Sequence, residues 1–171
     1  MSRKPGSMYR EIKGQAYCRR EYMGGVPSSR ITQFEHGTKG DYAVRITLRV
    51  VEQCQIRHIA LESARITANR YLAKKIPANA YHLKIRVFPH NIIRENKIAT
   101  GAGADRISDG MRHAFGKPVG TAARVKAGQE IITIETTQPN MAHAKLAMKR
   151  AAIKLPSPCY IDIERGLSAA A

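Results

Sequence analysis

The chain has 171 residues, of which 43% are hydrophobic, and this is enough for one domain with its own core. Lys and Arg number 29 against 13 Asp and Glu, so the formal net charge is +16. Self-repulsion on this scale favours a polyanionic partner. No apolar run approaches the roughly 18 residues that a membrane span needs, and we expect no secretory signal, because no apolar stretch follows the basic start. Nucleic acid is therefore the expected partner.

Cysteine and histidine give no sign of a metal site. The three cysteines, Cys18, Cys54 and Cys159, form no CxxC pair, and the six histidines have no zinc-ligand spacing to them. We therefore expect three reduced thiols, no metal and no cofactor.

Residues 1–30 predict an irregular basic arm. They contain seven Lys or Arg and two Glu, while glycines and prolines interrupt any long helix. Tyrosines lie among the charges, and a disordered tail usually lacks such aromatics. We expect the arm to become ordered on its partner, with a merely flexible terminus as the alternative.

Three periodic segments follow. Residues 44–51 alternate apolar with basic or polar side chains, which predicts a strand with one face in the core and with Arg45 and Arg49 on the other. Residues 58–75 have apolar side chains at helical spacing and end just before a proline, so they predict a helix. Residues 81–89 predict a second strand with a basic face. The alternative is a solvated face that only aids solubility.

The second half of the chain contains a glycine-rich segment. Residues 99–120 hold five glycines and sustain neither period, which predicts a long loop that is functional or disordered. Residues 121–127 and 130–136 predict paired strands joined by a hairpin turn at Gly128 and Gln129.

Two more elements complete the chain. Residues 139–155 predict a helix with a proline in its first turn, and residues 159–164 predict a short strand. The order of elements predicts an α+β fold, with a layer of two helices on a mainly antiparallel or mixed sheet. The expected organisation is a basic arm at 1–30, a single RNA-binding domain at 31–165 with a functional loop at 99–120, and a tail at 166–171.

No catalytic or nucleotide-binding pattern is complete. The spacing of the glycines in 99–120 breaks GxGxxG, and a proline occupies the position where a phosphate-binding loop needs Ser or Thr. Asp105 and Asp109 each have a basic neighbour, so local ion pairs explain them better than acid–base chemistry. Cys54 and His58 would face each other only on a helix. We therefore expect no catalytic residue.

A resemblance to a known family is carried by the motif GAGADRISDGMRHAFGKPVGTAARVKAGQ at 101–129. It closely resembles the archaeal and eukaryotic large-subunit ribosomal protein family L-ten-e, also called the QM protein, whose bacterial relative is L-sixteen. Further matching stretches are GVP at 25–27, ESARITANRYL at 62–72 and HLKIRVFPHNIIRENK at 82–97. The resemblance runs through nearly the whole chain and is closer to the archaeal and eukaryotic form, because the bacterial loop is shorter.

This resemblance implies an α/β-hammerhead-type fold and a structural, non-enzymatic role in the large ribosomal subunit of the cytoplasm. It implies a place in the central cleft, where the loop at 101–116 reaches toward the peptidyl-transferase region and bound tRNA. The partners would be large-subunit rRNA, with tRNA nearby and other large-subunit proteins as candidates, and no membrane.

The expected functional residues fall into two groups. Thirteen cations are expected to bind rRNA: Arg3, Lys4, Arg10, Lys13, Arg19, Arg20, Arg30, Arg45, Arg49, Lys84, Arg86, Lys117 and Arg124. Ten loop residues are expected near the peptidyl-transferase region and tRNA: Gly101, Ala102, Gly103, Ala104, Asp105, Arg106, Gly110, Met111, Arg112 and His113.

Two other functions fit part of the pattern. An RNA-modifying enzyme could use residues 99–120 as a mobile active-site loop, but it would need a cofactor site or a base–nucleophile pair, and the sequence offers neither. A DNA-compacting protein would fit the charge but not the long loop.

Overall fold

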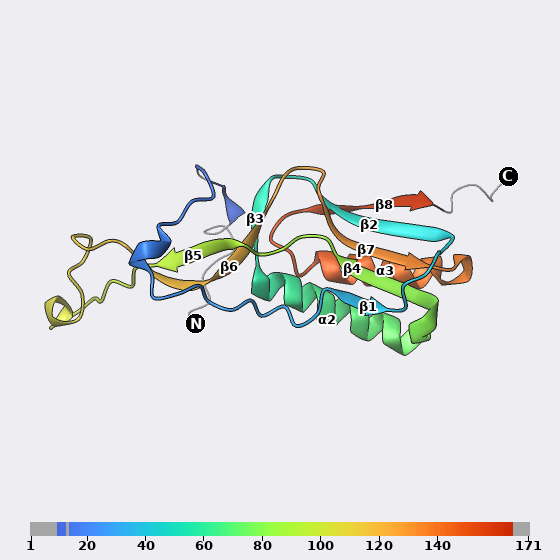
Figure 1. The fold of residues 1–171 in the computed structure, drawn as a ribbon, viewed down its shortest axis with the longest axis horizontal. Helices are drawn as coiled ribbons and strands as arrows, with labels where there is room; N and C mark the ends of the chain where they lie inside the picture. The colour runs from blue at the N-terminus through green and yellow to red at the C-terminus, as the bar shows by residue number, and fades with distance from the viewer. Residues whose placement is uncertain (1–9, 13, 166–171) are drawn as a thin grey trace.

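A computed structural model describes residues 10–12 and 14–165, with the side chain of Arg165 excepted. The molecule is elongated (Figure 1). One end is a five-stranded sheet covered by two helices, and a three-stranded sheet extends from it and ends in a long loop.

The five-stranded sheet has the order β1-β4-β7-β2-β8, and each neighbouring pair is antiparallel. Its strands are β1 (Glu35–Gly37), β2 (Val44–Val50), β4 (Tyr81–Ile85), β7 (Glu130–Thr136) and β8 (Cys159–Arg165). The alternation predicted at 44–51 is confirmed, because four apolar side chains of β2 are fully buried: Val44, Ile46, Leu48 and Val50. The strand predicted at 81–89 ends early, at Ile85, although Val87 is still buried.

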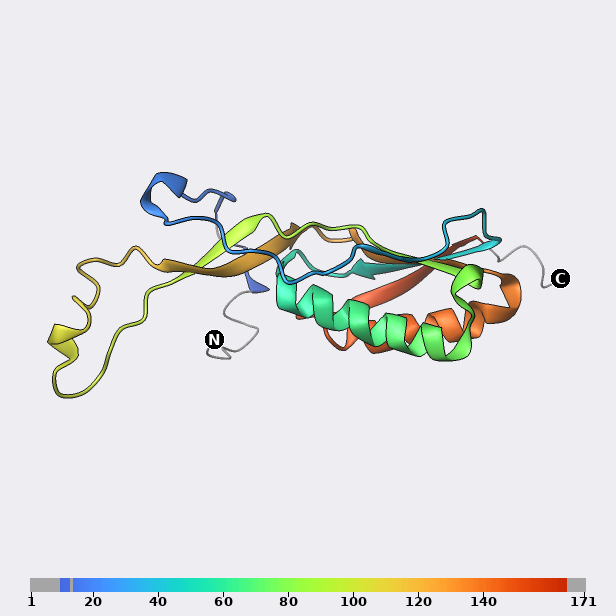
Figure 2. The ribbon, with the colours of Figure 1, turned by 60° about the horizontal axis from the view of Figure 1, so that its bottom comes forward.

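Two helices cover one face of this sheet (Figure 2). The helix α2 (His58–Lys75) has the predicted bounds, and it ends where the N–H of Ile76 donates to the carbonyl of Leu72 at 2.8 Å. The helix α3 (Met141–Ala152) is shorter than the predicted 139–155, because its proline lies in a preceding 3-10 turn, η4 (Gln138–Asn140). The α+β class with two helices is therefore confirmed, and every strand pairing is antiparallel rather than mixed.

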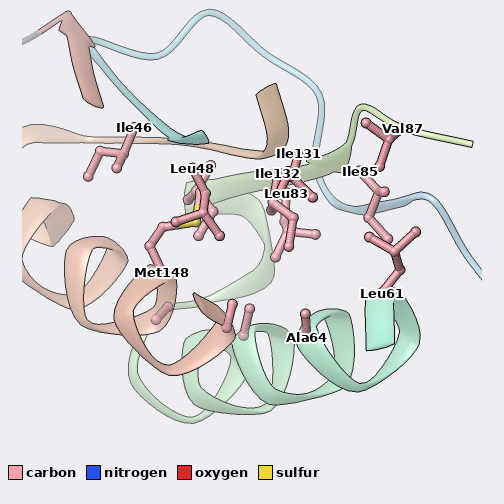
Figure 3. Packing of buried hydrophobic residues seen from close by; sticks show 14 of the residues in the cluster. Ile46, Leu48, Leu61, Ala64, Leu83, Ile85, Val87, Ile131, Ile132 and Met148 are labelled. Atoms are coloured by element: carbon pink, nitrogen blue, oxygen red, sulfur yellow. The ribbon is translucent and has the colours of Figure 1, made fainter. Parts of the chain in front are cut away.

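Most of the core lies between the two helices and the five-stranded sheet (Figure 3), and Cys54, Ile56, Ala123 and Val125 of the other sheet complete it. Helical spacing predicted that five residues of α2 enter it. Four of them are buried, Leu61, Ala64, Ala68 and Leu72, while Tyr71 is only half-buried. On α3 the buried face is mostly alanine, together with Met148, and small side chains let the helix approach the sheet closely. Figure 3 shows Met148 beside Leu48 and, farther along, Leu61 below Ile85.

The three-stranded sheet has the order β3-β6-β5, again antiparallel. Its strands are β3 (Cys54–Arg57), β5 (Asn91–Glu95) and β6 (Lys117–Val125). Neither β3 nor β5 was predicted, and β1 was also missed. The predicted loop 99–120 is wrong at its end, because residues 117–120 begin β6.

The predicted hairpin of 121–127 with 130–136 is wrong. A turn does form, and Gly128 takes a positive φ of 76° there. However, the N–H of Gly128 donates to the carbonyl of Val50 at 2.8 Å, which lies on β2 and not across a hairpin. The turn therefore passes the chain from one sheet to the other, so that β6 and β7 never pair.

Between β5 and β6, residues 96–116 form the long loop, which contains a single 3-10 turn, η3 (Ala104–Arg106). Its base is tight at Gly116, where an added Cβ would lie 2.6 Å from the backbone carbon of Glu95. Only glycine fits this close approach of two backbone segments.

We expect Ile46→Ala to lower the free energy of unfolding by roughly 2–5 kcal/mol, because it leaves a cavity between β2 and the helices. Chemical denaturation monitored by circular dichroism measures this. Ile107→Ala is the matched control, since Ile107 is 79% exposed on the loop, and it should cost less than about 0.5 kcal/mol. Equal losses in the two variants would mean that the loop belongs to the core.

Candidate nucleic-acid interface

The face of the five-stranded sheet that the helices leave open carries a network of ion pairs centred on Arg49. Its guanidinium lies 3.1 Å from Asp162, 2.8 Å from Glu164 and 3.1 Å from Glu130. Arg45 shares two of these carboxylates, at 3.3 Å from Glu130 and 3.1 Å from Glu164. The network therefore joins β2 to both of its neighbours, β7 and β8.

The basic face of β4 and the segment after it is paired in the same way. Lys84 forms an ion pair with Glu35 on β1, and Arg86 donates to the hydroxyl of Thr133 at 3.1 Å and lies 3.9 Å from Glu130. The segments that carry these cations contain no acid of their own, and the carboxylates come from neighbouring strands. For Arg45, Arg49, Lys84 and Arg86, rRNA binding stays a prediction, since each would have to exchange a carboxylate for a phosphate.

The ion pairs of this face also lower the pKa of two of its carboxyl groups, Glu164 and Glu35. Burial on its own would raise the pKa of Glu164, but the hydrogen bond from Arg49 and the positive charge of Arg45 lower that pKa from its ordinary value of 4.5. The pKa of Glu35 is lowered in the same direction by its hydrogen bond from Lys84.

The three-stranded sheet holds the beginning of the arm. Arg124 on β6 donates to the carbonyl of Gly14 at 2.6 Å, and Arg10 forms an ion pair with Glu52. Two of the cations predicted to bind rRNA therefore also fasten the arm to the sheet. Three others, Arg3, Lys4 and Lys13, lie outside the described residues.

Beyond this attachment the arm presents cations together with aromatic rings. Arg19, Arg20 and Arg30 are exposed, and so are Tyr17 and Tyr22. The arm, with its 3-10 turn η1 (Arg20–Tyr22), and β5 enclose an open hollow of about 430 Å³, lined by Ala16, Tyr17, Cys18, Arg20, Glu21, His90, Asn91 and Ile92. Guanidinium groups bind phosphate and aromatic rings stack on bases, so this hollow suits single-stranded or looped RNA.

Phe115 links the arm to the base of the loop. The Arg94 guanidinium lies 4.1 Å from the centre of the Phe115 ring, and the Tyr22 ring meets Phe115 edge to face, with centres 6.1 Å apart. Sequence reasoning missed this cluster. Predicting the cluster would have required predicting the strand β5, which carries Arg94. The sequence of β5 does not alternate between apolar and polar residues, so this strand could not be recognised.

Contacts within the loop hold its backbone, while most of its side chains are exposed to solvent. Asn96 donates to the carbonyl of Gly110 at 3.2 Å, and His113 pairs with Asp109 at 2.8 Å. Of the ten predicted loop residues, Ala104 and Gly110 are half-buried and the rest are exposed. Within the described part of the chain, Arg106 and Arg112 form no ion pair. The loop thus offers cations to a partner at the end of the molecule farthest from the helices (Figure 1).

The described ranges contain no cluster of metal ligands and no helix that could span a membrane. Among residues 10–12 and 14–165, no three His, Cys, Asp or Glu side chains converge as metal ligands. The helices described within those ranges are too short or too polar to cross a bilayer. The surface of exposed arginines and tyrosines is instead typical of a nucleic-acid-binding protein.

Comparison with known proteins identifies the family. The family described as ribosomal protein L16p/L10e matches residues 12–162. A protein of Methanocella arvoryzae named large ribosomal subunit protein uL16 is 56% identical over 167 residues, which cover 97% of each chain. A protein of the same name from Methanoculleus marisnigri is 55% identical, over 99% of this chain and 100% of its own length. Another from Halobacterium salinarum is 51% identical, over 97% of each chain.

The chain therefore belongs to the ribosomal protein L16p/L10e family. The resemblance to L-ten-e and L-sixteen is confirmed. The expected class, a structural ribosomal protein and not an enzyme, is confirmed with it.

We expect the free energy of unfolding to fall as the pH drops below about 4.5, the ordinary pKa of Glu164. A carboxyl whose pKa is depressed in the folded state binds protons more readily when unfolded, so acid favours unfolding. Arg49→Gln removes the hydrogen bond that depresses the Glu164 pKa, and it should make this acid-induced decline shallower as well as lower the stability at pH 7. Denaturant titrations at a series of pH values measure both effects.

Arg112→Gln is the control for this experiment, because Arg112 is exposed on the loop and should leave the acid profile unchanged. If Arg49→Gln and the wild type decline equally, the network does not set the pKa of Glu164.

Proposed function

We propose that the chain is a structural constituent of the large ribosomal subunit in the cytoplasmic ribosome, and that it binds large-subunit rRNA. Its relatives are named as proteins of that subunit, and its net charge of +16 favours binding to a polyanion. The fold is assigned, as a proposal, to the α/β-hammerhead type, with an arm at 1–30, an RNA-binding domain at 31–165 and a tail at 166–171.

The observation that carries the rRNA-binding proposal is the uneven distribution of charge. Among the described side chains, five of the 13 acids of the chain lie on the open face of the five-stranded sheet, against four Lys or Arg: the acids are Glu35, Glu130, Glu135, Asp162 and Glu164. That face is close to neutral. The positive excess must therefore lie on the other surfaces, and one of these is the arm, where exposed cations lie beside Tyr17 and Tyr22.

The arm and the base of the loop form one continuous rRNA contact in this proposal. Tyr22 and Arg94 both contact the ring of Phe115 there. Stacking on a ring is sequence-tolerant, and arginine adds charge, so the cluster would hold an RNA segment by its backbone and by exposed bases. The paired cations of the five-stranded sheet contribute least, because their charge is already balanced.

The loop at 101–116 is proposed to extend toward the peptidyl-transferase region and bound tRNA, in the central cleft of the subunit. Its described contacts are internal or lie at its base, so it adds little to the core. Its glycines make it costly to order alone, and a partner would have to compensate for that cost. Other large-subunit proteins are candidate neighbours.

Replacing residues 102–115 with a short Gly-Ser linker tests this role. We expect the purified variant to melt at the wild-type temperature and to bind large-subunit rRNA, because the core and the arm are untouched. Subunits of Methanocella arvoryzae that lack their own uL16 and are rebuilt with the variant should synthesise peptides more slowly or mature incompletely.

A variant without residues 166–171 is the control and should support normal peptide synthesis. If replacing the loop strongly lowers the melting temperature, the loop contributes to the core. Wild-type synthesis with the shortened loop would remove the tRNA-proximal role.

A further inference from the structure

The two helices carry an excess of positive charge that neither the fold nor the proposed loop contact uses. The helices and the turn after α3 hold one carboxylate, Glu62, and eight cations: Arg65, Arg70, Lys74, Lys75, Lys145, Lys149, Arg150 and Lys154. Arg65 lies 2.6 Å from Glu62 and neutralises it. The other seven cations are exposed and have no carboxylate partner among the described residues.

Three of these cations converge on a groove between α2 and α3. Its volume is about 330 Å³, and it is lined by Ile66, Thr67, Arg70, Tyr71, Lys74 and Arg150. The Arg150 guanidinium lies over the Tyr71 ring, 4.3 Å from its centre. The Tyr71 hydroxyl lies 3.2 Å from Nδ1 of His143, which fixes the ring from its other end.

This geometry prepares Arg150 to bind an oxyanion. When a guanidinium stacks on a ring, its flat face makes the contact and the N–H groups at its edge stay free. Two of these N–H groups can donate hydrogen bonds to two oxygens of one phosphate. Tyr71 thus holds the edge of Arg150 in place before any ligand arrives, while Arg70 and Lys74 add charge to the same groove.

We propose that the outer surface of α2 and α3 is a second rRNA-binding surface, and that the Tyr71–Arg150 groove takes backbone phosphates of the RNA. The proposal rests on the ribosomal function above and adds a surface to it. In Figure 2 the helices lie below the sheets and η1 lies above them. One RNA segment cannot easily meet both, so the protein binds between two RNA segments.

The apolar side chains of this surface do not favour a bilayer. A helix that lies on a membrane needs a broad apolar face opposite its charges. The apolar face of α3 is already buried against the sheet, as its core alanines and Met148 show. Only scattered side chains such as Leu146 and Ile153 remain exposed on it.

Lysine acetylation of the full-length protein tests the proposal directly. With protein-free large-subunit rRNA of Methanocella arvoryzae bound, we expect Lys74, Lys145 and Lys149 to lose most of their reactivity relative to the free protein. Lys97 and Lys117 lie at the base of the loop, so their loss of reactivity measures the rRNA contact proposed above for the arm and the loop base. Lys39 should stay reactive, because it lies in the turn between β1 and β2.

The outcomes separate the two proposals. Protected loop lysines with reactive helix lysines would overturn the second surface and leave the ribosomal function standing. A complete lack of protection would contradict both. Protection of the helix lysines in whole subunits but not on bare rRNA would identify a protein as the occupant, and would likewise overturn the proposal.

A charge-matched pair of variants gives an independent measure. Each phosphate contact contributes roughly 0.9 to the slope of log affinity against log salt on B-DNA, so Lys74→Gln with Arg150→Gln should make the slope for this rRNA shallower by up to about two units. Lys39→Gln with Lys126→Gln removes the same charge elsewhere and should change it less. Equal changes in the two double variants would overturn the proposal.

Discussion

The ion-pair network around Arg49 leaves one face of the five-stranded sheet close to neutral, so the net positive charge of the chain lies on other surfaces. One guanidinium binds Glu130 on β7 together with Asp162 and Glu164 on β8, and Arg45 reinforces two of these contacts. Partly exposed pairs of this kind add little stability individually, but a shared network fixes the positions of the strands relative to one another. Because five acids gather on one sheet face, the arm and the helices keep an excess of positive charge.

The two sheets then divide the work of folding and binding. The five-stranded sheet and its helices enclose most of the core, and Cys54 and Ile56 of β3 with Ala123 and Val125 of β6 complete it. The opposite end of the three-stranded sheet carries the loop away from the core. One of the crossings between the sheets is at Gly128, whose N–H donates to the carbonyl of Val50 and so ties this crossing to β2. The loop therefore depends on the core for its position, while its own described contacts add little to the core.

Sequence periodicity predicted the elements whose burial is local in the chain. The helix α2 and the strand β2 were found because each places one regular apolar face in the core. By contrast β1, β3 and β5 have only three to five residues, too few for a period to emerge, and the hairpin failed because β7 pairs with strands far away in the chain. The site was harder still. The basic alternation of β2 indicated a free cationic face, yet its carboxylate partners lie more than 80 residues away, at Glu130 and beyond. The helix cations were visible, but only the fold shows that they gather around Tyr71.

The central claim is that charge is partitioned between a paired sheet face and unpaired binding surfaces. A structure of the assembled large subunit by electron cryo-microscopy, at a resolution that shows side chains, tests it most directly. The account predicts that Arg49 still binds Glu130 and Glu164, with no phosphate in contact, while phosphates meet the arm, the loop and the groove at Arg150. Phosphates bound to Arg45 and Arg49 in place of these carboxylates, with the helix surface facing solvent, would contradict it.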